Sequence, residues 1–172
     1  MNKQGQIHIY TGNGKGKTTA AFGLAVRALC SGKRVFIGQF VKSMKYNETK
    51  IETLFDHVTI KQYGRGCFIS KDPEKEDIEE AQKGWQDAVA ALQNPDNDVV
   101  ILDELTIAIY FRLLSVENIL KGLKSKEPHI EVVITGRYAP KELIDFADLV
   151  TEMVEVKHYY TKGILSRDGI DK

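Results

Sequence analysis

A glycine-rich segment near the start of the chain constrains the fold more than any other feature. Residues 10–20 read YTGNGKGKTTA, and they join a short strand-like run at 7–11 to an amphipathic stretch that begins at Thr18. Glycine lets the backbone curl so that its N–H groups converge on an anion, and the start of the following helix adds a favourable dipole. A strand, a glycine loop and a helix in this order predict a phosphate-binding loop rather than a plain glycine turn.

The residue types within this loop have separate expected tasks. The main-chain N–H groups and the Lys17 amine are expected to bind phosphate, and the Thr18 hydroxyl is expected to ligate Mg²⁺. The predicted phosphate-binding residues are Gly12, Asn13, Gly14, Lys15, Gly16, Lys17, Thr18 and Thr19. The match to G-x-x-x-x-G-K-[ST] is not strict, because Thr11 stands where the first glycine belongs. Gly12 also stands where the partner-activated ATPases carry a second signature lysine, which weakens the case for that class.

The rest of the chain alternates short apolar runs with longer amphipathic ones. We predict strands at 7–11, 34–40, 58–62, 99–102, 130–135 and 150–156, and helices at 18–31, 48–55, 73–92, 105–111, 116–125 and 141–147. The helix at 73–92 is expected to begin with Asp72 as its N-cap and Pro73 as its first residue. This alternation predicts an α/β fold that is P-loop NTPase-like, with a mostly parallel sheet and helices on both faces. The length of 172 residues predicts a single domain over 1–172.

A pair of carboxylates follows the apolar strand predicted at 99–102. The segment 97–106 reads NDVVILDELT, so that Asp103 and Glu104 come directly after the strand. The carboxyl ends of parallel strands meet at one edge of the sheet, where the phosphate loop also lies. Thr18, Asp103 and Glu104 are therefore the predicted metal ligands, because Mg²⁺ prefers oxygen donors. Glu104 would polarise water in a hydrolase and bind the metal in a transferase, and this motif does not separate the two.

Composition excludes several classes of protein. The 24 basic and 24 acidic residues give no net charge, which argues against a nucleic-acid partner. Cys30 and Cys67 lie far apart with no C-x-x-C spacing, as is usual in a reducing compartment. The sequence has no signal-peptide pattern and no apolar run long enough to span a bilayer. We therefore expect a cytoplasmic protein with no membrane partner.

Several segments, in this order along the chain, resemble the P-loop corrinoid adenosyltransferases of cobalamin synthesis and salvage. They are TGNGKGKTTAAFG at 11–23, QFVK at 39–42, ILDELT at 101–106, TGR at 135–137 and DFADLVTEMVEVK at 145–157. The resemblance runs from about residue 7 to the C-terminus. It implies transfer of the 5′-deoxyadenosyl group of ATP to the Co(I) of a corrinoid such as cob(I)yrinic acid a,c-diamide, with release of triphosphate. It also implies that the nucleotide lies reversed, so that the loop cradles the far phosphate.

The resemblance also implies roles for individual residues. Lys17, Glu104 and Arg137 are expected to be catalytic, Arg137 through its contact with phosphate. Thr18 and Glu104 would contact Mg²⁺, with Mn²⁺ as the alternative metal, and Asp103 would support them. Co(I) is itself the nucleophile, so that the enzyme has to align C5′ and stabilise the departing triphosphate rather than supply a base.

The corrinoid side of the reaction is expected to involve the segment YGRGCFIS at 63–70. The family pattern carries a Phe and a Trp here, whereas this segment has no Trp, and Phe68 is the residue expected to face the corrin. The resemblance further implies a reduced flavoprotein as electron donor and a homodimer.

Two other functions stay open at this point. In a generic P-loop kinase or ATPase, Glu104 would activate water or the loop would serve an acceptor hydroxyl. A kinase usually has an arginine-rich lid, and the sequence contains no dense arginine cluster. A corrinoid-binding escort protein would bind the corrinoid tightly without releasing triphosphate.

Overall fold

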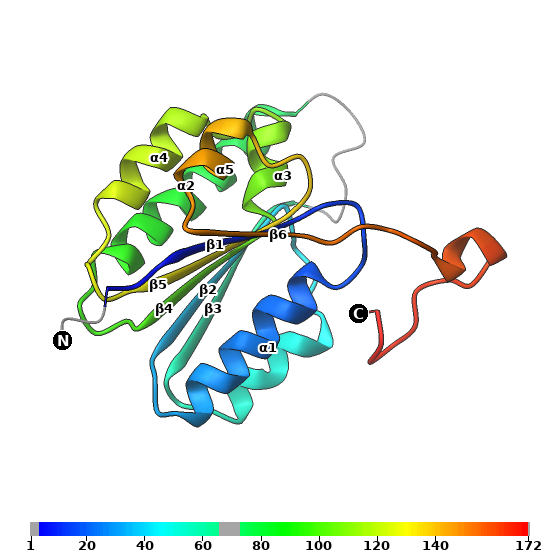
Figure 1. Ribbon diagram of the computed structural model, residues 1–172, viewed down its shortest axis with the longest axis horizontal. Coiled ribbons are helices and arrows are strands. Elements are labelled where there is room, and N and C mark those ends of the chain that lie inside the picture. The colour runs from blue at the N-terminus through cyan, green and yellow to red at the C-terminus, as the bar shows by residue number, and fades with distance from the viewer. Residues whose placement is uncertain (1–3, 66–72, 172) are drawn as a thin grey trace.

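The apolar runs of the sequence become the strands of one parallel sheet. A computed structural model describes residues 4–65 and 73–171 (Figure 1). Within these residues the sheet has six strands in the order β3-β2-β4-β5-β1-β6, and every neighbouring pair is parallel. The strands are β1 (Ile7–Thr11), β2 (Val35–Phe40), β3 (Val58–Tyr63), β4 (Val99–Asp103), β5 (Glu131–Thr135) and β6 (Leu149–Glu152). The prediction of an α/β fold with a parallel sheet is confirmed.

Helices cover both faces of this sheet. They are α1 (Lys17–Cys30), α2 (Lys75–Leu92), α3 (Leu105–Tyr110), α4 (Val116–Lys124) and α5 (Lys141–Phe146), with 3-10 helices η1 (Asn47–Thr53) and η2 (Tyr159–Lys162). Figure 1 shows α1 and η1 on one side of the sheet, and α2, α3, α4 and α5 on the other. The described helices include none that is both long enough and apolar enough to cross a membrane.

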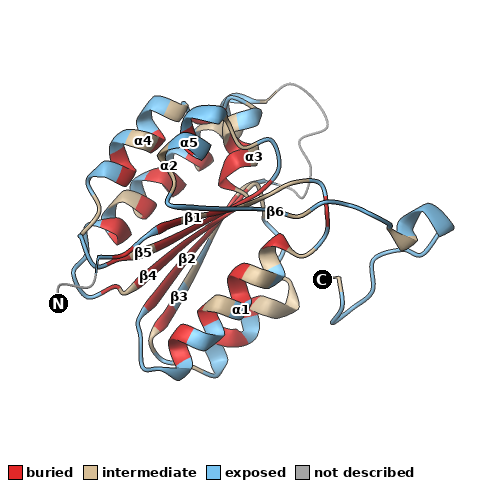
Figure 2. Cartoon of the chain, viewed as in Figure 1, coloured by how far each residue is buried: buried red, intermediate tan, exposed pale blue. Residues whose placement is uncertain are grey.

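Alternation along the central strands explains why both faces are covered. Val99 and Ile101 of β4 pack in the cluster formed with α1, whereas Val100 and Leu102 pack in the cluster formed with α2, α3, α4 and α5. Successive side chains of a strand point to opposite faces, so that a strand buried on both sides reads as a continuous apolar run. Figure 2 shows the central strands as the buried layer and β6 as an exposed edge.

Trp85 belongs to the larger of these clusters, as its spacing with Ala81, Ala88 and Leu92 predicts. Helix α1 ends at a glycine. Gly32 follows the helix with a φ of 81°, and its N–H donates to the carbonyl oxygen of Leu29 at 2.9 Å.

Three predicted elements differ from the structure by more than one residue at an end. Helix α2 begins at Lys75 with Glu74 as its N-cap, so that the start predicted at Pro73 is wrong; Asp72 lies outside the described residues. Glu74 and Asp77 exchange side-chain and main-chain hydrogen bonds in a capping box, which satisfies the first free N–H groups of the helix. The helix predicted at 48–55 is the 3-10 helix η1. Strand β6 ends at Glu152, because the chain beyond it turns onto the glycine loop.

Candidate functional site

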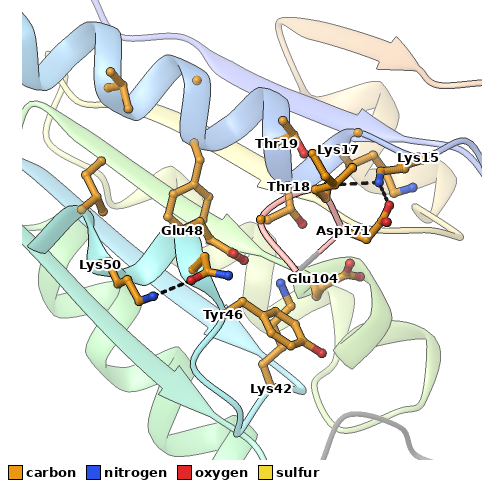
Figure 3. Close-up of a pocket in the computed structure, with 18 of the residues that line it drawn as sticks. Lys15, Lys17, Thr18, Thr19, Lys42, Tyr46, Glu48, Lys50, Glu104 and Asp171 are labelled. Atoms are coloured by element: carbon orange, nitrogen blue, oxygen red, sulfur yellow. Dashed lines mark hydrogen bonds and ion pairs between the residues drawn. The ribbon is translucent and has the colours of Figure 1, made fainter. Parts of the chain in front are cut away.

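A cleft of about 1020 Å³ opens at the carboxyl edge of the sheet, where the phosphate loop was predicted. Its walls come from the start of α1, from residues 42–55, and from residues 169–171 near the C-terminus (Figure 3). One part of the lining is apolar, formed by Phe22, Val26, Ile51, Leu54 and Phe55. The charged part of the lining has more cations than acids: Lys15, Lys17, Lys42, Lys50 and Arg137 against Glu48, Glu104 and Asp171. The cleft is therefore suited to a ligand with an anionic part and an apolar part.

The glycine loop has the conformation that its sequence predicts. Gly12 and Gly16 have φ values of 96° and 113°, a region that favours glycine. Gly14 lies against the chain that follows β6: its N–H donates to the carbonyl oxygen of Met153 at 2.6 Å. A Cβ on Gly14 would lie 2.6 Å from the same oxygen, so that a larger residue would push the two segments apart. The segment after β6 thus supports the loop from behind.

Lys17 and Arg137 both turn toward carbonyl groups of this loop. Lys17 is 6% exposed as a residue, and its ammonium donates to the carbonyl oxygen of Gly14 at 2.7 Å. Burial, followed by the nearby charge of Arg137, lowers the pKa of Lys17, and the carboxylates of the site oppose this shift. The exposed Arg137 places its Nη2 3.4 Å from the carbonyl oxygen of Asn13. A polyanion in the cleft would relieve the repulsion between these two cations.

Asp103 lies fully buried at the end of β4 and organises the polar groups below the loop. Its Oδ1 accepts hydrogen bonds from the hydroxyls of Thr18 at 2.8 Å and Thr135 at 2.7 Å. Its Oδ2 accepts from the Gln39 amide at 3.1 Å and from the Lys42 ammonium at 2.7 Å. Burial alone would raise the pKa of Asp103, but the Lys42 charge and these hydrogen bonds hold it below its ordinary value.

Glu104 lies beside Asp103 but differs from it by facing the cleft. It has a φ of 59°, and its N–H donates to the Thr135 hydroxyl at 3.0 Å. Burial and then the charge of Asp103 raise the pKa of Glu104, while Lys42, Lys17 and Arg137 oppose the rise. An added cation in the cleft would therefore favour its charged form.

The oxygen donors at this edge fit a magnesium ion. Mg²⁺ is usually held by one or two carboxylates together with substrate phosphates and water, and a dedicated cage is not required. The described residues include no cluster of three or more His, Cys, Asp or Glu that would hold a metal ion by itself. Glu104 lines the cleft, whereas Asp103 is buried and bonded to Thr18. Glu104 and Thr18 are thus the groups that a cation would meet, and Asp103 orients the threonine.

Most of the predicted site residues meet in this cleft. Those that line it are Lys15, Gly16, Lys17, Thr18, Thr19, Glu104 and Arg137. Gly12, Asn13 and Gly14 lie on the same loop, beside Met153 and Arg137. Phe68, the residue expected to face a corrin, and Cys67 lie outside the described residues.

Lys42, Gln39 and Thr135 were not predicted as site residues. Gln39 lies one residue before the end of β2, Lys42 lies two residues beyond that end, and Thr135 ends β5. Strands β2 and β5 flank β4 in the sheet. Their positions at the carboxyl ends of these strands were the available signal. The sheet order, which the sequence does not reveal, was needed to connect them with Asp103.

Comparison with known proteins agrees with the geometry. The sequence matches the family model described as ATP:corrinoid adenosyltransferase BtuR/CobO/CobP over residues 3–171. It is 36% identical over 172 residues to corrinoid adenosyltransferase CobA of Salmonella typhimurium, covering 99% of this chain and 87% of that protein. It is 35% identical to a corrinoid adenosyltransferase of Escherichia coli K12, with the same coverage. A third relative, a corrinoid adenosyltransferase of a Sinorhizobium species, is 36% identical and is covered to 81% of its length.

Proposed function

The chain belongs to the ATP:corrinoid adenosyltransferase family, and from this premise we propose how its cleft performs the reaction. The reaction moves the 5′-deoxyadenosyl group of ATP to the Co(I) of a corrinoid and releases inorganic triphosphate. The observation that carries the proposal is the meeting of Lys17, Glu104 and Arg137 at one phosphate-loop cleft.

The chemistry asks the protein for positioning and charge rather than for a base. An electron pair of Co(I) forms the new bond to C5′, and the electrons of the breaking C5′–O bond remain on the triphosphate. Lys15, Lys17 and Arg137 lie where the loop would hold that leaving group, so that the growing negative charge meets fixed positive charge. Because Lys17 is almost fully buried, its interaction with phosphate would be screened little by water.

The metal would be held by Thr18 and Glu104, with Asp103 fixing the threonine hydroxyl. Bound there, Mg²⁺, or Mn²⁺ as the alternative, neutralises part of the phosphate charge. The hydrogen bond of the Glu104 N–H to the Thr135 hydroxyl fixes the main chain from which the carboxylate extends into the cleft.

Four further assignments belong to the same proposal. Reduction of Co(II) to Co(I) needs an electron donor, and we propose a reduced flavoprotein, because flavins transfer single electrons. We propose that Phe68 contacts the corrin, that the 172 residues form a single domain, and that the active protein is a cytoplasmic homodimer.

An anaerobic assay tests the reaction directly. The protein is mixed with ATP, Mg²⁺ and chemically reduced cob(I)alamin, the light-sensitive adenosylcobalamin spectrum is followed, and the phosphate product is identified. Adenosylcobalamin together with intact triphosphate is the expected result. ADP and phosphate without a spectral change would instead show a kinase or ATPase. Corrinoid binding with no turnover would show an escort protein.

Two variants test the proposed roles of Lys17 and Glu104. Lys17→Ala and Glu104→Gln should each lower kcat/KM by about 10²-fold or more, the range seen when one charge-stabilising group is lost. Lys141→Ala is the matched control, because this lysine lies on the surface of α5 with 81% of its side chain exposed. If all three variants kept the activity of the unmodified protein, the cleft would not be the site of transfer.

A further inference from the structure

The end of the chain returns to the phosphate loop and binds one of its lysines. We use the name C-terminal tail for residues 158–171. The Lys15 ammonium forms an ion pair with the Asp171 carboxylate and donates to the Tyr159 hydroxyl at 2.8 Å and to the Ile170 carbonyl oxygen at 3.2 Å. Figure 3 shows Asp171 directed at Lys15 at the edge of the cleft. Lys15 is thus held through three groups of the tail.

The tail is folded around the Asp171 carboxylate. This side chain is only 11% exposed and accepts hydrogen bonds from the Tyr159 hydroxyl and from both the main-chain N–H and the Nε of Arg167. The Arg167 guanidinium lies 4.7 Å from the centre of the Tyr159 ring. These contacts hold the carboxylate in one orientation, facing Lys15.

A second contact ties the tail to the opposite wall of the cleft. The Asn47 side-chain amide donates to Asp168 Oδ1 at 2.7 Å, and Asn47 lies at the start of η1. The two anchor points are Asp168 and Asp171. Asp171 and the two residues between these points line the cleft itself. The tail therefore covers part of the space beside the phosphate loop.

We propose that the Asp171 carboxylate is an internal competitor of the substrate polyphosphate, occupying Lys15 until phosphate displaces it. The inference rests on the proposed function, in which the loop and Lys15 bind the triphosphate part of ATP. A carboxylate and a phosphate at the same ammonium repel each other, so that binding one weakens binding of the other. The tail then sets the affinity of the loop for polyphosphate, and return of Asp171 to Lys15 favours release of the triphosphate product.

Calorimetric binding of inorganic triphosphate in the presence of Mg²⁺ tests this competition with the full-length chain. Asp171→Asn should bind triphosphate about three- to fivefold more tightly, the range expected from loss of a competing, partly exposed ion pair. Asp168→Asn removes the same charge from the tail at a residue that contacts Asn47, and should change the affinity by less than about twofold. Unchanged or weaker binding by Asp171→Asn would overturn the proposal.

Trypsin cleavage after Arg167 gives a readout that does not depend on affinity. If triphosphate displaces the tail, adding triphosphate should accelerate the release of residues 168–172. Mass spectrometry measures this release. Asp171→Asn should release them rapidly even without triphosphate. Slower release in the presence of triphosphate would mean that the tail closes over the ligand, and this result also contradicts competition.

A third variant separates this inference from the proposed function. Lys17→Ala should weaken triphosphate binding by about tenfold or more, because it removes the ammonium that the loop itself holds through the Gly14 carbonyl oxygen. If Lys17→Ala binds triphosphate normally, the phosphate-loop assignment itself fails. If Lys17→Ala loses affinity while Asp171→Asn binds like the unmodified protein, only the role of the tail is refuted.

Discussion

Replacement of Asp103 by asparagine should show how much the buried carboxylate stabilises the fold. The side chain is fully buried, and both of its oxygens accept hydrogen bonds. An amide of the same shape has one oxygen, which must face Lys42 and Gln39 because both of these only donate at this point. Its NH₂ group would then face Thr18 and Thr135, whose hydroxyls can rotate to accept. The change thus keeps the packing and removes mainly the charge that pairs with Lys42.

The expected loss is about 3 kcal/mol in the free energy of unfolding. Breaking a buried ion pair by removing one partner costs about 3–5 kcal/mol. The lower end applies because the Lys42 side chain keeps 14% of its exposure and can turn toward water. At roughly 3 °C per kcal/mol for a chain of this length, Tm should fall by about 9 °C.

The pH dependence of this difference follows from the two pKa shifts. The folded-state pKa of Asp103 is lowered, so that its contribution is present above its unfolded value of 3.8 and is lost as the pH falls through the folded value. Burial acts to lower the pKa of Lys42, but Asp103 raises it overall, so that its contribution is complete below 10.5 and is lost as the pH rises through the folded value. The variant should therefore differ from the unmodified protein by a constant amount between about pH 5 and 9, and by less in acid.

Urea unfolding of the metal-free and nucleotide-free protein at several pH values measures the effect. Asp145→Asn is the matched control: its partner Lys141 is four residues away on the surface of α5, and the loss should stay below about 0.5 kcal/mol. Combining Asp103→Asn with Lys42→Met should cost less than the sum of the two single changes, because the unpaired charge is then gone. A loss below about 1 kcal/mol, or additive single effects, would refute the argument that Asp103 and Lys42 form a buried, coupled pair.

Three glycines give further tests of packing. Gly122→Ala should destabilise the protein by about 1–3 kcal/mol in urea unfolding, because the added Cβ would lie 2.3 Å from the Trp85 ring. Gly14→Ala should lower ATP turnover by more than its effect on Tm explains, because the Cβ would displace Met153 and with it the phosphate loop. Turnover equal to that of the unmodified protein would show that this contact does not shape the loop. Gly23→Ala, in α1 with nothing within 4 Å of the added Cβ, should raise the free energy of unfolding by about 0.5–1 kcal/mol, and a lower stability would reveal a hidden steric conflict.

The strands that the sequence predicts well are those with at least one buried face, which is the Ile7 and Ile9 side of β1 and both sides of β4. Strand β1 has the predicted bounds Ile7–Thr11, and the continuous apolar run of β4 is extended by only one residue, to Asp103. Strand β6 could not be bounded in the same way, because it is an exposed edge strand with no buried face to fix its end. The start of α2 was misplaced because Asp72-Pro73 and Glu74 with Asp77 are both good N-terminal signals, and local sequence alone does not rank them.

Only the site residues that belong to recognisable sequence motifs could be predicted. Thr18 and Asp103 are 85 residues apart, yet their contact follows from the rule that parallel strands bring their carboxyl ends together. Lys42 was missed as a site residue because a lysine after a strand is common. Its contact with Asp103 depends on β2 lying next to β4 in the sheet. Asp171 was missed because the tail has no periodic pattern, and its contact with Lys15 spans almost the whole chain.

The cations of the cleft are held in place by acceptors that differ in how easily a ligand can replace them. Lys42 is paired with Asp103, whose carboxylate is buried at the end of a central strand and bonded to several side chains, so that this pair belongs to the fixed framework. Lys17 bonds to a loop carbonyl, which is a neutral acceptor. A charged phosphate oxygen can replace it, because its hydrogen bond to the ammonium is stronger. Lys15 is paired with Asp171, a carboxylate on a tail whose residues are mostly exposed. A polyphosphate entering this cleft would thus leave Lys42 in place and compete for Lys15 and Lys17, because these two can exchange their partners without unfolding the end of a buried strand.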